Sequence, residues 1–203
     1  MKKHLLIMAA GMVLLTSALI ACGNNEDKTA EKAPTEAEQF ASVAFQEENI
    51  KRGEYLVNIM GCHDCHTPKV MTEFGPAPDT TRLLSGYNAS IPLGSYDTAI
   101  ASKGEWVLFN GQITAFAGPW GLSYAANLTP DETGIGGWTL DHFRKALKEG
   151  KSKGIDGGRP LLPPMPWQYF RHINDEDLSA IFDYLKSLKP VNNRVPAPML
   201  AKH

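Results

Sequence analysis

The residues best suited to chemistry are those of the stretch Cys62-His63-Asp64-Cys65-His66. Each cysteine thiol can add across one vinyl group of a porphyrin, and a gap of two residues lets a tight turn reach both vinyl groups. The next residue, His66, then lies under the iron and offers a ring nitrogen as an axial ligand. The pattern therefore predicts one covalent haem c on Cys62 and Cys65, with His66 bound to the iron.

Two other uses of a cysteine pair remain open. A thioredoxin-like redox site would require a βαβ pattern around the pair, and none is visible. A structural zinc site needs four ligands, commonly from a second pair at similar spacing. The only other cysteine is Cys22, for which the sequence suggests a different role.

A second iron ligand is expected between two predicted helices, in the stretch Pro163-Pro-Met-Pro-Trp167. A thioether is a weak ligand, so a stiff proline-rich loop must hold it in place, and Met165 is the candidate. The alternative is that Met165 is ordinary core packing. His172 and, less favourably, His142 are the rival ligands. A backbone carbonyl of Gly75-Pro76 is the expected acceptor for the second ring nitrogen of His66.

The amino terminus has the pattern of an export signal. Residues 5–20 carry no charge and follow a short basic start. This uncharged stretch is shorter than a typical membrane-spanning helix and has the length of a signal-peptide core. The stretch Leu19-Ile20-Ala21-Cys22 resembles a bacterial lipobox, so we expect residues 1–21 to be a signal peptide and Cys22 to be lipidated. An ordinary secretory signal or an uncleaved anchor is the alternative. Covalent haem attachment in bacteria occurs outside the cytoplasm, which agrees with export.

Residues 22–47 are polar and predicted to form a disordered tether after the lipidated cysteine. The expected location is the bacterial cell envelope, anchored by lipid at the periplasmic or extracytoplasmic face. Loss of residues 1–21 removes two lysines, which leaves 18 basic and 22 acidic side chains and changes the formal charge from −2 to −4. No basic stripe is present, so nucleic-acid binding is not expected.

Residues 48–195 are expected to form one domain, followed by a tail at 196–203. Apolar spacing predicts helices over residues 48–60, 139–149 and 174–189. Thr139 and Asn174 are the expected N-caps of the second and third helices. Gly53 in the first helix suggests a close crossing with the third helix, near Phe182 or Tyr184.

The segment between the cysteines and the second helix is rich in Gly and Pro. Trp106–Phe109 and Gln112–Phe116 flank Asn110-Gly111, which predicts a β-hairpin with a two-residue type I′ turn. This insertion, about residues 85–125, either covers a haem edge, forms a docking surface or is decoration. The expected fold is therefore mainly α, a helical domain around one haem, with an insertion that contains a hairpin.

With these features in place, residues 48–195 resemble class I cytochromes c. Asn127-Leu-Thr-Pro-Asp131, Thr133-Gly-Ile-Gly-Gly-Trp138 and the Met165 stretch are similar to haem domains of cytochrome subunits that accept electrons from membrane-associated alcohol and sugar-acid dehydrogenases. The resemblance implies axial His66 and Met165, with Asn127 and Trp138 near the haem or its propionates. Those subunits often carry two or three haems, whereas this sequence holds one attachment motif.

The expected function is a membrane-tethered electron carrier with one His/Met haem and no catalytic residues of its own. Its partners would be redox proteins, such as a dehydrogenase, an oxidase or another cytochrome, and the membrane through the lipid. The alternatives are a haem subunit of a dehydrogenase or oxidase complex, and a haem peroxidase or ligand sensor with a dissociable distal ligand.

Overall fold

The computed structural model of this protein describes residues 35–201. The predicted signal peptide, the lipidation of Cys22 and the tether up to residue 34 lie outside the described residues. Within the described range, no helix combines the length and apolar character needed to cross a membrane.

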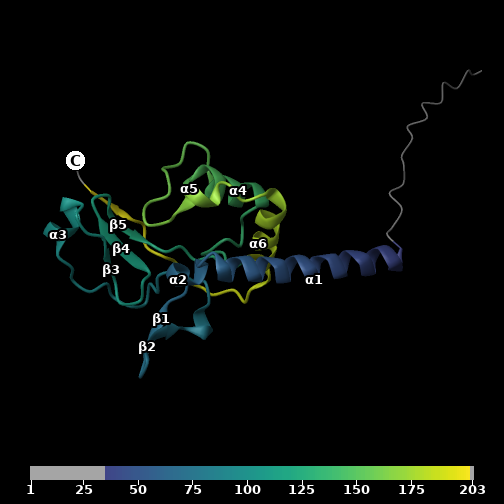
Figure 1. Ribbon diagram of the computed structural model, residues 1–203, viewed down its shortest axis with the longest axis horizontal. Coiled ribbons are helices and arrows are strands. Elements are labelled where there is room, and N and C mark those ends of the chain that lie inside the picture. The colour runs from purple at the N-terminus through teal and green to yellow at the C-terminus, as the bar shows by residue number, and fades with distance from the viewer. Residues whose placement is uncertain (1–34, 202–203) are drawn as a thin grey trace, which may run out of the picture. The chain divides into compact units, whose positions relative to one another are not determined.

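Helices and two small antiparallel sheets make up the described chain (Figure 1). The sheets have the strand orders β1-β2 and β3-β4-β5-β6. In chain order the elements are α1 (Glu36–Ile59), α2 (Cys62–His66), β1 (Lys69–Thr72), β2 (Gly75–Pro78), the 3-10 helix η1 (Thr80–Arg82), α3 (Thr98–Lys103), β3 (Leu108–Phe109), β4 (Ala115–Gly118), β5 (Gly121–Tyr124), α4 (Leu140–Glu149), the 3-10 helix η2 (Ser152–Gly154), α5 (Trp167–Phe170), α6 (Asp175–Ser187) and β6 (Met199–Leu200).

The three predicted helices are present as α1, α4 and α6. Thr139 caps α4 by accepting a hydrogen bond from the backbone N–H of His142, and Gly150 ends it with a φ of 68°. Asn174 caps α6 by accepting from the N–H of Asp177. The buried faces of these helices, together with Leu84 and Ile135 from loops, form the main core; its helical members are Leu56, Val57, Phe143, Leu178, Ile181, Phe182, Tyr184 and Leu185.

The predicted crossing of α1 and α6 is confirmed at Gly53. A Cβ built on Gly53 would overlap the carbonyl oxygen of Ala180 and would lie 2.7 Å from the Cβ of Tyr184. The two backbones are therefore in direct contact, which only glycine permits at this position. An Arg52–Asp177 ion pair of 2.9 Å lies beside the same crossing.

Helix α1 begins earlier than predicted. Residues 36–47 continue it as exposed helix, whereas the sequence suggested that they belong to the disordered tether. The segment is rich in Ala, Glu and Gln, which favour helix, and each residue added to an existing helix gains a hydrogen bond without a new nucleation step. The packed half of α1 thus supports its exposed half.

The predicted hairpin is present, but its turn is different. Strands β3 and β4 pair Leu108 with Ala117 and Phe109 with Phe116, so residues 110–114 form the loop. The side-chain oxygen of Asn110 accepts from the N–H groups of Thr114 and Ala115, which closes this wider turn. The residues expected as a tail, 196–203, also contribute β6, which pairs with β5 and extends the sheet.

We predict that Gly53→Ala destabilises the protein despite the better helix propensity of alanine. Propensity would add about 1 kcal/mol of stability, but the added methyl group overlaps the Ala180 carbonyl, and overpacking costs typically about 1–3 kcal/mol. Urea unfolding should show a net loss. Gly137→Ala is the matched control, because a Cβ at Gly137 meets nothing within 4 Å. Equal stability of the Gly53 variant and the wild type would contradict the close crossing.

Candidate functional site

The cysteine–histidine motif forms the short helix α2 at the carboxyl end of α1 (Figure 1). Gly61, with a φ of 70°, adopts the left-handed conformation that separates the two helices. Positions i, i+3 and i+4 of a helix share one face, so the spacing of Cys62, Cys65 and His66 places all three on the same side of α2. All three side chains are half-buried.

Lys69 and Thr67 fix α2 to the rest of the domain. The Lys69 ammonium donates to the carbonyl oxygens of His63, Asp64 and Thr67 at 3.1, 2.9 and 2.5 Å. The fully buried Thr67 hydroxyl accepts from the N–H of Leu84 at 2.9 Å. Neither residue has a sequence pattern that marked it beforehand, yet Lys69 satisfies open carbonyls at the end of the helix and Thr67 connects the helix to Leu84.

One ring nitrogen of His66 is hydrogen-bonded to the protein, and the other is available to bind a ligand. Its Nδ1 lies 2.8 Å from the carbonyl oxygen of Ala126, an acceptor only, so Nδ1 carries the proton and Nε2 is the free lone pair. Burial lowers the pKa of His66, which favours the neutral ring at pH 7. A neutral imidazole with its second nitrogen held by a carbonyl is the form in which histidine ligates metals.

The prediction that Gly75-Pro76 supplies this acceptor was wrong. Both residues belong to β2, where Gly75 pairs with Thr72 and Pro76 with Met71 in an outlying hairpin. Ala126 reaches His66 because the chain after β5 runs against residues 84–87, with the N–H of Tyr87 donating to the Ala125 carbonyl at 3.0 Å.

The two thiols do not have the character of a redox pair. Burial raises the pKa of Cys62 to about 11 and also raises the pKa of Cys65, so both are protonated at neutral pH. Catalytic and redox cysteines instead have lowered thiol pKa values. In the part of the chain that the structure describes, no group of three or more His, Cys, Asp or Glu side chains is placed to hold a metal ion. Two free thiols and one oriented imidazole on a single helix face fit a covalently attached haem.

Met165 lies half-buried in a loop that is attached at three points. The Ser123 hydroxyl of β5 donates to the Pro163 carbonyl at 2.7 Å, and the N–H of Leu161 donates to the Gly150 carbonyl at 2.6 Å. The Trp167 indole packs on Gly150 so closely that a Cβ there would overlap the ring. The loop borders a hollow of about 240 Å³ lined by Met165, Leu161, Trp167, Tyr169, Gln168 and three prolines.

The rival ligands have other places in the structure. His142 uses Nδ1 in the capping box of α4, 3.2 Å from the N–H of Thr139. His172 is exposed just before α6. Met60 packs against the main core, and Met71 is 76 % exposed on β1. Met165 is thus the methionine on a loop that is tied down from both sides.

Asn127 and Trp138 have roles in packing and hydrogen bonding. Asn127 follows Ala126 and is buried; its amide nitrogen donates to the Val191 carbonyl at 2.9 Å and its oxygen accepts from Thr129. Trp138 is half-buried against the main core. Asn127 is therefore next in sequence to the His66 partner, while Trp138 has an ordinary core contact.

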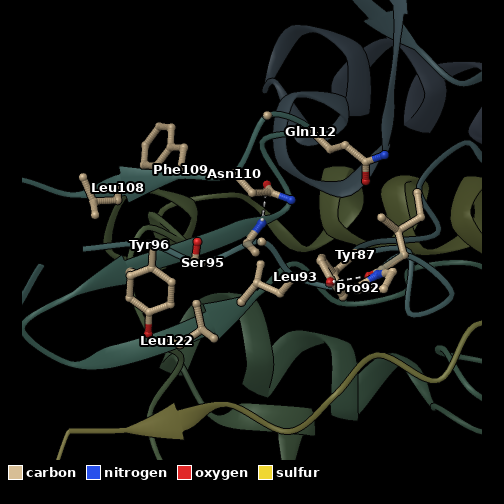
Figure 2. Close-up of a pocket in the computed structure, with 15 residues that line it drawn as sticks. Tyr87, Pro92, Leu93, Ser95, Tyr96, Leu108, Phe109, Asn110, Gln112 and Leu122 are labelled. Carbon is tan, nitrogen blue, oxygen red and sulfur yellow. Dashed lines mark hydrogen bonds between the residues drawn. The ribbon is translucent and has the colours of Figure 1, made fainter. Parts of the chain in front are cut away.

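A separate cavity of about 430 Å³ lies between the 91–96 segment and β3, β4 and β5 (Figure 2). Leu93, Leu108 and Leu122 line it with Tyr96, and the Tyr87 hydroxyl donates to the Ile91 carbonyl at 2.7 Å at its edge. No predicted site residue lines this cavity, so it belongs to the insertion and not to the cysteine–histidine site.

The sequence comparisons agree on one class of relatives. No protein-family model matches the chain. It is 38 % identical over 121 residues, 52 % of this chain and 10 % of the relative, to a nicotinate dehydrogenase subunit of Pseudomonas putida. It is 28 % identical to the fructose dehydrogenase cytochrome subunit of Gluconobacter japonicus, over 92 % of this chain and 29 % of the relative. With the gluconate 2-dehydrogenase cytochrome c subunit of Pantoea cypripedii, identity is 30 % over 71 % of this chain and 25 % of the relative.

The chain spans less than a third of the length of each of these relatives. The two that match most of this chain are both named as cytochrome subunits of dehydrogenases. At modest identity, therefore, this chain is homologous to a part of cytochrome c subunits of dehydrogenases.

Proposed function

We propose that the chain carries one haem c, attached to Cys62 and Cys65, and passes electrons for a dehydrogenase. The observation that carries this proposal is the state of His66, which is neutral, bound at Nδ1 to the Ala126 carbonyl and free at Nε2 on the same helix face as two protonated thiols. The names of the relatives support the same conclusion.

Met165 is the proposed second axial ligand. Sulfur binds haem iron weakly, so the loop that carries it must lose little entropy on ligation, and the Ser123 and Gly150 contacts provide that restraint. Once bound, the haem would supply a one-electron iron couple. A methionine ligand raises the reduction potential of this couple relative to a second nitrogen ligand. With His66 and Met165 both holding the iron, no position would remain open for a substrate, so the chain would act as an electron carrier and not as an enzyme by itself.

The proposed setting is the cell envelope, on the periplasmic or extracytoplasmic side, with a lipid on Cys22 as the membrane anchor. The charge of −4 after removal of residues 1–21 suits a redox partner with a positive docking face. A dehydrogenase is the favoured donor because the relatives are named for such enzymes. In this setting the chain serves as the haem subunit of a dehydrogenase complex or as a shuttle to an oxidase or another cytochrome.

We predict that replacing Cys62 and Cys65 together by serine abolishes covalent haem. Serine hydroxyls do not add to vinyl groups under the conditions at which thiols do. The protein should be produced with the export and haem-attachment machinery, and haem detected on a denaturing gel. Cys22→Ser is the matched control and should keep the haem while losing membrane association. Haem retained by the double variant would disprove attachment at these residues.

Met165→Ala should remove the long-wavelength ferric absorption band typical of methionine-ligated haem, lower the reduction potential and let the iron bind carbon monoxide. Met71→Ala, a methionine that is 76 % exposed, is the control and should change none of these properties. An unchanged spectrum in the Met165 variant would refute the assignment. Carbon monoxide binding by the wild type would instead indicate a dissociable ligand and favour a sensor or peroxidase.

A further inference from the structure

The segment after α6 returns to the site through Asn193, which is buried at 4 % exposure. Its amide nitrogen donates to the Ser85 carbonyl at 2.6 Å and the Tyr87 carbonyl at 2.8 Å. Its amide oxygen accepts from the N–H of Ala89 at 3.1 Å. The amide nitrogen of Asn193 thus holds the two residues that flank Gly86, and its amide oxygen holds Ala89.

Gly86 connects this grip to His66. Its N–H donates to the His66 carbonyl at 2.7 Å, and its backbone lies directly against Ala125 and Ala126. A Cβ on Gly86 would be 2.5 Å from the Ala126 carbonyl oxygen, and its φ of 75° also requires glycine. Ala126 supplies the acceptor of the His66 ring, so the segment held by Asn193 forms the wall behind that acceptor.

A second connection reaches Ala126 from the other side. The amide nitrogen of Asn127, the next residue, donates to the carbonyl of Val191 at 2.9 Å and to the Thr133 hydroxyl at 3.2 Å. The same hydroxyl accepts from the backbone N–H of Asn193 at 2.9 Å. Residues 191–193 therefore hold both of the segments that contact His66, residues 85–87 and residues 126–127.

We propose that Asn193 is a positioning residue for His66, and that Asn193, Asn127 and Thr133, together called the Asn193 clamp, set the strength of the His66–Ala126 hydrogen bond. The inference rests on the proposed function, because its consequence appears at the iron. A strong bond from Nδ1–H to a carbonyl makes Nε2 a more basic ligand, which stabilises the ferric state. Loosening the clamp lengthens this bond and raises the reduction potential.

Two variants test the proposal in the haem-loaded protein. Asn193→Ala removes the grip on Ser85 and Tyr87, and Thr133→Val removes the oxygen shared by the other two members of the clamp while keeping the side-chain shape. In each variant the equilibrium ratio of ferrous to ferric protein should rise by up to about tenfold, which corresponds to a reduction potential about 59 mV higher. Each should also speed exchange of the His66 Nδ1 proton with solvent at least tenfold, as followed by NMR of the ferrous protein.

Asn174→Ala is the matched control. It removes the N-cap of α6 and so destabilises the fold, but the hydrogen bonds of the Asn174 side chain go to Asp177 and to no member of the clamp. It should leave the potential and the exchange rate unchanged. Wild-type values in both clamp variants, or an equal shift in the control, would overturn the proposal.

The wild type gives a test that does not depend on a variant folding. Native-state hydrogen exchange should show the amides of Gly86 and Asn193 and the His66 Nδ1 proton opening in one step, with equal dependence on denaturant. Opening of Asn193 while the His66 proton stays protected would overturn the clamp. A protein that holds no covalent haem at all would instead reject the proposed function.

Discussion

The hydrogen bond from His66 Nδ1 to the Ala126 carbonyl is the interaction on which the site depends. It fixes the tautomer and the direction of the ring, and so decides which nitrogen would bind the iron of the proposed haem. A net hydrogen bond contributes only about 0.5–1.5 kcal/mol to stability, so its importance lies in geometry and not in the free energy of folding. The contacts of Lys69, Thr67 and Gly86 hold the donor side, and Asn127 with Asn193 holds the acceptor side.

Contacts from both neighbouring and distant parts of the chain hold the site in place. The crossing of α1 and α6 at Gly53 fixes the helix that leads into the cysteines. The loop of Met165 is held by β5 and by the end of α4. Fixed surroundings of this kind suit one-electron transfer, because a ligand set that does not move keeps the reorganisation on each step small.

The elements with local signals were predictable from the sequence. The caps Thr139 and Asn174 each depend on residue types within one turn, and a glycine inside an otherwise helical pattern indicated the crossing at Gly53. The partner of His66 did not follow from the sequence, because it is a backbone carbonyl 60 residues away and any residue type could supply it. The same reason hid the role of Asn193, whose partners are backbone carbonyls of a distant segment. The sequence did not predict the early start of α1. Residues 36–47 are polar, which is typical of a disordered segment, although the same residues also favour helix.

A crystal structure of the haem-loaded protein that resolves the His66 ring would test this hydrogen bond and the haem site together. We expect iron on Nε2, thioether bonds at Cys62 and Cys65, and Nδ1 within hydrogen-bond distance of the Ala126 carbonyl, close to 2.8 Å. A His66 ring turned away from Ala126, with iron held by another side chain or bound to neither cysteine, would contradict this expectation.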